Sequence, residues 1–274
     1  MMLVNEEKCI RCGACVKDCL LNCIKIRDGK AKIRNLICFK CGHCIAVCPK
    51  NAVYSDEYDM NEVKEYNKED FFIDSDNLLN FIKFRRTIRQ FDTSKKVEKE
   101  KIEKIIEAGR FTPTGSNAQD VSYIVIRNNI NTLKELTIET LNDIGKNILH
   151  DVTPQYKNYA PYAKMWTKMY ADFKENKYDS DKLLFNSNDV IFVVSNSEVN
   201  ASLASSTMEL MANSLGIGVL YSGFLAFAAK NSEKIKDLLG IGNANKVVTC
   251  MVLGYPSVKY FRTVPRNNAH ITWK

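Results

Sequence analysis

The sequence lacks several features that mark secreted, membrane-spanning or nucleic-acid-binding proteins. Residues 1–8 contain no basic segment followed by an apolar core, so no export signal is expected. No run of about eighteen apolar residues occurs, which argues against a membrane span. Lysines and arginines outnumber aspartates and glutamates, which gives a formal net charge of +7. The basic residues are scattered, however, and do not form the basic stripe interleaved with aromatics that favours nucleic-acid binding. These absences predict a cytoplasmic protein with no membrane or nucleic-acid partner.

Cysteine is almost absent after residue 48, where only Cys250 occurs, inside an apolar run that predicts a buried position. The other nine cysteines lie within residues 1–48, and eight of them repeat the pattern C-x2-C-x2-C-x3-C. In this pattern three thiolates bind one iron–sulfur cluster and the fourth reaches the other cluster. The spacing therefore predicts two 4Fe-4S clusters. One would be held by Cys9, Cys12, Cys15 and Cys48, the first cysteine set, and the other by Cys38, Cys41, Cys44 and Cys19, the second cysteine set.

Two other interpretations of these cysteines are weaker. Zinc sites usually combine two separated C-x2-C pairs, and three cysteines at intervals of three leave little room for two tetrahedral pairs. A disulfide framework would require a secreted chain. Gly13 and Gly42 lie inside the two runs, where a positive φ costs glycine little. Residues 1–55 therefore resemble a bacterial two-cluster ferredoxin, with Cys23 left over as a small buried side chain or as an exchange ligand.

The rest of the 274-residue chain has room for one ordinary domain of about 200 residues. Residues 56–77 are polar and acidic, which predicts a partly helical linker before a second domain over 78–274. Apolar spacing predicts helices in this domain over 78–85, 97–108, 131–144 and 201–215, with Gly109 as the stop of the second. Short β-branched runs predict strands of one sheet at 123–126, 190–194 and 247–253. The alternation indicates an α+β fold, and residues 151–182 are expected to form helix and loop that would suit a lid.

Two polar segments of the second domain predict a binding site. Arg85, Arg86 and Arg89 surround Thr87 at the end of the first predicted helix. Forked guanidinium donors suit a phosphate monoester, although a solvated basic patch would have the same composition. The loop at 112–119 follows the next helix and is dense in hydroxyl, amide and backbone donors. Together the two segments predict a site for a phosphate and a polar ring.

These residues resemble the nitroreductase family of FMN-dependent oxidoreductases. The resemblance is carried by Arg-Arg-Thr-Ile-Arg-Gln-Phe at 85–91, Pro-Thr-Gly-Ser-Asn-Ala-Gln at 113–119 and Leu-Gly-Ile-Gly at 215–218. It spans residues 78–274 and implies an α+β sandwich that forms a homodimer, with FMN at the subunit interface. Asp120 and Val121 depart from the Pro-Trp pair that many relatives have here, so the relatives' substrate preference does not carry over.

The resemblance also implies which residues hold the flavin. Arg85, Arg86, Thr87 and Arg89 would bind the phosphate and ribityl chain, while Pro113, Thr114, Gly115 and Asn117 would line the isoalloxazine from the other protomer. The main chain at Ser222 and Gly223 would approach the N5 edge, where a donor favours reduced flavin. Of the tail residues Arg262 and Arg266, Arg266 better fits the residue that closes over the phosphate.

Iron–sulfur clusters carry one electron at a time, and flavins accept one or two. Their combination predicts an FMN-dependent oxidoreductase in which an external low-potential donor reduces the clusters and a nitroaromatic, quinone or similar conjugated acceptor is reduced at FMN. No protein nucleophile is needed, and no catalytic residue is assigned. Two alternatives stay open. NAD(P)H could reduce FMN directly, leaving the clusters as structural or redox-sensing groups, or the chain could be a binding or electron-storage protein without stoichiometric FMN. The absence of a G-x-G-x-x-G element counts only weakly against the nicotinamide.

Overall fold

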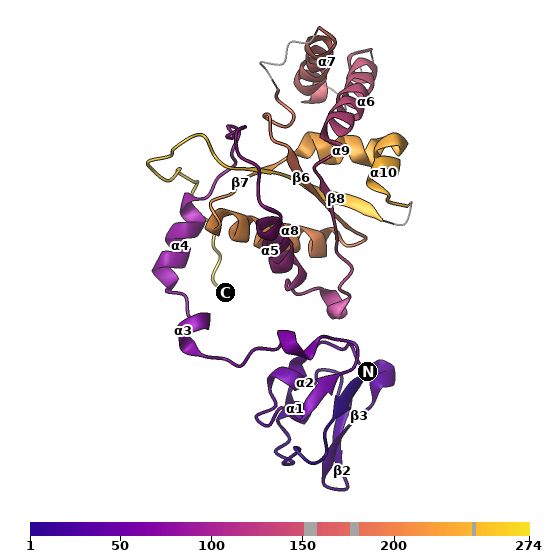
Figure 1. Ribbon diagram of the computed structural model, residues 1–274, viewed down its shortest axis with the longest axis vertical. Helices are drawn as coiled ribbons and strands as arrows, with labels where there is room; N and C mark the ends of the chain where they lie inside the picture. Colours follow the sequence, from indigo (N-terminus) through magenta and orange to yellow (C-terminus); the bar gives the residue numbers. More distant parts are fainter. Residues whose placement is uncertain (151–157, 176–180, 243–244) are drawn as a thin grey trace. The chain divides into compact units, whose positions relative to one another are not determined.

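A computed structural model describes residues 1–150, 158–175, 181–242 and 245–274 (Figure 1). The chain divides into two compact units. The first comprises Met1–Asp74 and Thr114–Ala118, and the second comprises Ser75–Pro113 and Gln119–Lys274. Each unit has a hydrophobic core of its own. Among the residues described, no helix is long and apolar enough to cross a membrane.

The first unit contains two short antiparallel strand pairs. β1 (Met2–Val4) pairs with β4 (Val53–Ser55), so the two ends of the cysteine-rich segment are joined. β2 (Ile24–Arg27) and β3 (Lys30–Ile33) form a hairpin. The helices are short: α1 (Ala14–Asp18), η1 (Asn35–Ile37), α2 (His43–Ala46), η2 (Met60–Glu62) and α3 (Lys68–Phe71).

The core of the first unit is small. Cys15, Cys23, Ile24 and Ala31 are its buried residues, and further cysteines pack around them. In a module of this size, a single hydrophobic core rarely supplies more than about 3–5 kcal/mol of stability. Bound metal centres can supply the missing free energy, because their binding is coupled to folding.

The second unit is built on a four-stranded antiparallel sheet in the order β5-β6-β8-β7. Its strands are β5 (Ser122–Ile126), β6 (Asp189–Ser195), β7 (Gly218–Tyr221) and β8 (Lys246–Gly254). The strands predicted at 123–126, 190–194 and 247–253 are therefore confirmed and share one sheet. β7 was not predicted, because a four-residue strand that begins with glycine resembles a turn in sequence.

Helices cover both faces of this sheet, which gives an α+β sandwich (Figure 1). One face is covered by α6 (Ile130–His150), α7 (Ala160–Lys174), α9 (Gly223–Asn231) and α10 (Glu233–Leu239). The other face is covered by α5 (Lys99–Arg110) and α8 (Glu198–Ser214). β6 is buried along its whole length: Phe192 belongs to the first core and its neighbour Ile191 to the second. The period of two in strand side chains explains this division.

The predicted helices are present with shifted ends. The first, α4 (Ser75–Phe84), begins before the predicted residue 78, and α9 and α10 were missed. Gly109 does not stop α5 and lies inside it. A Cβ on Gly109 would meet Met208 and the Tyr123 hydroxyl at 2.8 Å, so this glycine permits close packing of α5. Within the predicted 151–182 segment, α7 is helix as expected, and 151–157 and 176–180 lie outside the described residues.

Candidate functional site

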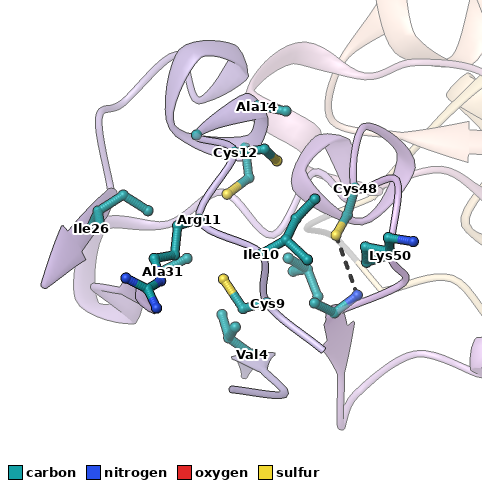
Figure 2. A pocket seen from close by; sticks show the side chains of 14 residues that line it. Val4, Cys9, Ile10, Arg11, Cys12, Ala14, Ile26, Ala31, Cys48 and Lys50 are labelled. Atoms are coloured by element: carbon teal, nitrogen blue, oxygen red, sulfur yellow. Dashed lines mark hydrogen bonds between the residues drawn. The ribbon is translucent and has the colours of Figure 1, made fainter. Parts of the chain in front are cut away.

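A pocket in the first unit brings together cysteines from both sequence runs. Cys9, Cys12, Cys15 and Cys48 all line it, with apolar neighbours that include Ile26 (Figure 2). Cys9 precedes α1, Cys15 lies on α1, and Cys48 follows α2. The structure therefore brings Cys48 to the first cysteine set, as the spacing of the two runs predicted.

The electrostatics of the thiols agree with this grouping. Burial raises the pKa of Cys15, and repulsion from Cys48, Cys12 and Cys9 raises it further. The four side chains are thus close enough to interact, and the Cys15 thiol resists ionisation beside the other three. A cationic metal centre would relieve this repulsion, because a coordinating thiol is deprotonated outright.

In the second cysteine set, Cys38, Cys41 and Cys44 also interact electrostatically. Burial raises the pKa of Cys44 to about 11, with Cys38 and Cys41 as the next causes. Cys19 is linked to this set through Cys23. The Cys23 backbone N–H donates to Cys19 Sγ at 3.3 Å. Burial is the largest cause that raises the pKa of the Cys23 thiol, and both Cys19 and Cys38 raise this pKa further. Cys23 itself is 4% exposed, which fits the interpretation as a small buried side chain.

Backbone donors point at several of these sulfur atoms. Cys48 Sγ accepts from the Ala52 N–H at 3.3 Å, and Cys38 Sγ accepts from the Lys40 N–H at 3.3 Å. The pKa of Cys9 is lowered, first by a backbone hydrogen bond from Ala31. Such bonds favour thiolate and help to set the potential of a bound cluster.

The glycines before the two short helices fix the loop geometry. Gly13 has φ 74° and Gly42 has φ 76°, and each is the N-cap of the helix that follows. These left-handed values confirm the predicted need for glycine. A Cβ at either position would meet nothing within 4 Å, so the requirement is conformational and not one of space.

The donor set has the chemistry that a four-iron cluster requires. Such a cluster is bound by four cysteine thiolates, and four cysteines line this one pocket. Within the described ranges, no group of three or more His, Cys, Asp or Glu side chains is arranged to hold a single metal ion.

The arginine run of the second unit divides between two environments. Arg85 Nη1 contacts Glu209 Oε2 at 2.5 Å, and Glu209 is buried on α8. Arg86 lies 4.2 Å from the centre of the Tyr260 ring and donates to the Arg262 carbonyl at 2.6 Å. Arg89 is exposed. The predicted phosphate ligands are thus near one another in sequence but do not all face one point.

Arg85 keeps one donor free. Its Nε is buried and has no hydrogen-bond partner among the residues described. A buried donor without a partner is costly, and an anion bound here would satisfy it. Thr87 forms a bridge with Val219 of β7, which fixes the run against the sheet edge. An oxyanion such as a phosphate therefore fits Arg85.

Ser222 and Gly223 begin α9 at the end of β7. Ser222 is the N-cap and accepts from the Leu225 N–H at 3.3 Å, while its own N–H donates to the Cys250 carbonyl at 2.8 Å. Gly223 is the first helical residue, so its N–H has no partner within the helix. Of this pair, Gly223 is the available backbone donor for a flavin edge. Cys250 is 1% exposed, which confirms its prediction as a core residue.

The loop residues 114–118 belong to the first unit. They include η3 (Gly115–Asn117), in which Ser116 and Asn117 are left-handed. Asn117 Nδ2 donates to the carbonyls of Phe39 and Lys40 at 3.0 and 3.2 Å. The assignment of Pro113, Thr114, Gly115 and Asn117 to the isoalloxazine stays a prediction, as does that of Arg266, which is exposed in the tail.

One polar residue of the second unit, Glu209, was missed in the sequence. Glu209 lies among the buried positions Ala201, Met208 and Ala212 of α8, and an acidic residue on that apolar face was the available signal. Tyr221 donates to the Ser205 carbonyl at 2.7 Å. Burial of its hydroxyl end raises the pKa of Tyr221, and nearby Glu209 raises it further. Together they form a polar cluster beside Arg85.

Asp120, one of the departures from the family pattern, has a structural role. Its two carboxylate oxygens accept from Asn200 Nδ2 at 2.7 Å and from Ser195 Oγ at 2.8 Å. The hydrogen bond from Asn200 is the largest cause that lowers the pKa of Asp120. Asp120 therefore ties its loop to the end of β6 and the start of α8.

Comparisons with known proteins agree with this arrangement. Residues 82–255 match the model of the nitroreductase family, and residues 8–52 match a 4Fe-4S dicluster domain. No curated protein matches the chain. Similar solved structures include FMN-bound nitroreductases from Bacteroides fragilis (20% identity, 71% of this chain and 98% of that one, TM-score 0.52) and Desulfitobacterium hafniense (21%, 71% and 97%, 0.50). A BluB-like flavoprotein from Clostridium difficile is also similar (15%, 71% and 99%, 0.53). The chain belongs to the nitroreductase family and carries a 4Fe-4S dicluster domain ahead of the family domain.

Proposed function

We propose that this protein is an FMN-dependent oxidoreductase that receives electrons through two 4Fe-4S clusters and reduces a nitroaromatic, a quinone or a similar conjugated acceptor. The observation that carries the proposal is the pocket that joins Cys48 to Cys9, Cys12 and Cys15 in a chain that continues into a nitroreductase-family domain. When an iron–sulfur module and a flavin-type domain occur in one polypeptide, the module can pass electrons to the flavin.

The two cysteine sets would each hold one cluster. When bound, the clusters supply one-electron transfer at low potential. The chain itself supplies the thiolates, the shared pocket and the N–H donors from Ala52, Lys40 and Cys23 to sulfur. Because each set would take its fourth ligand from the other run, each cluster would join both halves of the module.

FMN would be held in the second unit by the residues predicted from the family resemblance. Arg85 supports this best, since its buried Nε needs an acceptor of the phosphate kind. The first helical N–H of α9, at Gly223, would donate to the flavin's N5 edge. Bound FMN supplies one- and two-electron chemistry, and the protein binds, orients and shields it.

The flavin site would be completed by a second copy of the chain. No residue of α4 is buried, and its apolar side chains Leu79 and Phe84 are each 46% exposed. Val199 and Leu203 on α8 are 67% and 50% exposed. The tail after 256 has no regular structure, and its Trp273 is 90% exposed. Apolar surface of this extent is typical of an interface, which supports the homodimer.

Quantification of iron, sulfide and flavin on one anaerobic sample tests the proposal. We expect about eight irons and one FMN per chain. The same sample should reduce a nitroaromatic or a quinone when supplied with reduced ferredoxin. A chain without stoichiometric FMN would contradict the proposal and favour a binding or electron-storage protein. Acceptor reduction driven by NAD(P)H at an equal rate with and without clusters would favour a direct nicotinamide-dependent reductase.

A further inference from the structure

Four positive side chains share one face of the β2–β3 hairpin. The register places Lys25 opposite Lys32 and Arg27 opposite Lys30. Directly opposed residues of an antiparallel pair, and residues two apart on a strand, project from the same face. We name this set of Lys25, Arg27, Lys30 and Lys32 the cationic ladder.

The cationic ladder is unfavourable for the hairpin itself, because like charges directly opposite one another destabilise a sheet. Two of its members are partly compensated: Lys32 pairs with Glu6, and Lys30 Nζ donates to the Cys9 carbonyl at 3.1 Å. Lys25 and Arg27 are exposed and form no ion pair with any residue of the described ranges. An anionic partner from outside the chain would supply the missing compensation.

The opposite face of the hairpin lines the first cysteine pocket. Ile26 and Ala31 are among the pocket residues, together with Arg11 and Lys50 (Figure 2). The cationic ladder therefore lies on the outer side of the two strands whose inner side contacts the cluster site. A protein bound to the ladder would be separated from this pocket by a single layer of hairpin.

The charge of the whole module favours an acidic partner. Residues 1–55 contain ten lysines and arginines but only four aspartates and glutamates. Two oxidised clusters with their thiolates, at roughly −2 each, do not cancel this excess. A patch of one charge sign steers partners of the opposite sign and accelerates their association.

We propose that the cationic ladder is the docking surface for an acidic electron-carrier protein, and that the first cysteine pocket is where its electrons enter. The carrier is a reduced low-potential iron–sulfur or flavin protein. In the transfer step the carrier's cofactor is oxidised by one electron and the loaded module is reduced by one, with no bond formed and no proton moved. The inference rests on the proposed function, since it needs the clusters to receive electrons.

An acidic protein fits this surface better than a nucleic acid. The hairpin carries no aromatic side chain on which a base could stack. Each strand has four residues, which is short for a groove that tracks a phosphate backbone. The ladder lies next to a redox pocket, so a carrier protein bound there could transfer electrons to it, whereas a nucleic acid could not.

The test uses the full-length, cluster-loaded protein under anaerobic conditions. The variant Lys25→Glu/Arg27→Glu reverses the two uncompensated charges, and it should fold at least as well as wild type because it places glutamates opposite Lys32 and Lys30. The matched control Lys104→Glu/Lys234→Glu makes the same change of net charge at exposed helix positions of the second unit. The probes are a photoreduced acidic plant-type ferredoxin and the methyl viologen radical cation. Stopped-flow absorbance records bleaching of the clusters.

We expect the ferredoxin rate constant at low salt to fall about tenfold or more in the ladder variant and less than about twofold in the control. Salt should slow wild type and affect the ladder variant little. The viologen rate should not fall. An unchanged ferredoxin rate, an equal loss in the control, or a parallel loss with viologen would overturn the docking assignment. Equally strong binding of duplex DNA, abolished by the same variant, would assign the ladder to nucleic acid instead.

This readout separates the inference from the proposed function. Bleaching of the clusters is measured before any electron reaches a flavin. If the clusters did not serve FMN, the salt dependence and the effect of the ladder variant would still appear. If the carrier docked elsewhere, flavin-dependent reduction would persist while both of those effects disappeared.

Discussion

Arg85 and Glu209 form an ion pair of 2.5 Å across 124 residues of sequence. The Glu209 side chain is 9% exposed and the Arg85 side chain 29% exposed, so the contact is largely shielded from water. It links the end of α4 to the middle of α8 and fixes the guanidinium whose Nε is left for an anion. The ion pair therefore positions Arg85, a residue of the proposed flavin site, against helix α8 of the fold.

Replacement of Glu209 by Gln should weaken the second unit. Hydrogen bonds to charged groups contribute about 1.5–3 kcal/mol each, and we expect a loss of free energy of unfolding in that range. Urea denaturation followed by circular dichroism measures it. The control Glu233→Gln removes an exposed pair with Lys236 and should cost less than about 1 kcal/mol. Equal losses in the two variants would show that the Arg85 contact has no special weight.

Asp120 should make the stability of the second unit depend on pH. Its hydrogen bonds lower the pKa of Asp120 in the folded state. Its contribution to the free energy of unfolding is therefore fully present above the unfolded pKa of about 3.9, and it is lost as the pH falls through the folded pKa. Asp120→Ala should cost about 1.5–3 kcal/mol near pH 7. The difference in free energy of unfolding between Asp120→Ala and wild type, measured from denaturation curves, should become smaller towards pH 3. A difference that does not change with pH would mean that the carboxylate charge is irrelevant.

The exchange of ligands between the two cysteine runs predicts which variants behave alike. Cys48→Ala and Cys15→Ala should each lose about half of the iron and leave the same residual electron paramagnetic resonance signal. Cys19→Ala and Cys44→Ala should leave the other signal. If Cys48→Ala instead matched Cys44→Ala, each run would bind its own cluster and the exchange would be wrong.

The exposed face of α4 predicts that its disruption separates the protomers. Leu79→Glu with Ile82→Glu should convert a dimer to a monomer, because two charges would be buried without partners at the interface. Light scattering after size-exclusion chromatography measures the mass. Leu149→Glu, at a side chain 40% exposed on the end of α6, is the control and should stay dimeric. A dimer that survives the α4 substitutions would place the interface elsewhere.

Local patterns in the sequence were enough to predict much of the fold. The strands β5, β6 and β8 are apolar runs rich in β-branched residues. The spacing of the two cysteine runs predicted that Cys48 would lie near Cys9, Cys12 and Cys15, and these four residues line one pocket; the exchange of ligands itself stays a prediction. β7 could not be predicted in this way. Its four residues form a strand because they pair with β8, and the sequence of Gly218–Tyr221 contains no signal that predicts this pairing.

The site residues show the same limit. The arginine run was visible, but the division between Arg85 and Arg86 depends on Glu209 and Tyr260, which are remote in sequence. Gly109 was taken for a helix stop because glycine often ends helices, whereas tight packing against Met208 and Tyr123 decided its place inside α5. Asp120 could be seen only as a departure from the family, since its partners Ser195 and Asn200 are supplied by the fold.

The central claim is that electrons reach the flavin by way of the clusters. The most direct test is anaerobic stopped-flow reduction of bound FMN by reduced ferredoxin, in wild type and in Cys12→Ala/Cys41→Ala, which removes one ligand from each cysteine set. We predict rapid bleaching of the flavin in wild type and its loss in the variant, at equal FMN content. Equal rates of flavin bleaching in the two proteins would contradict the claim.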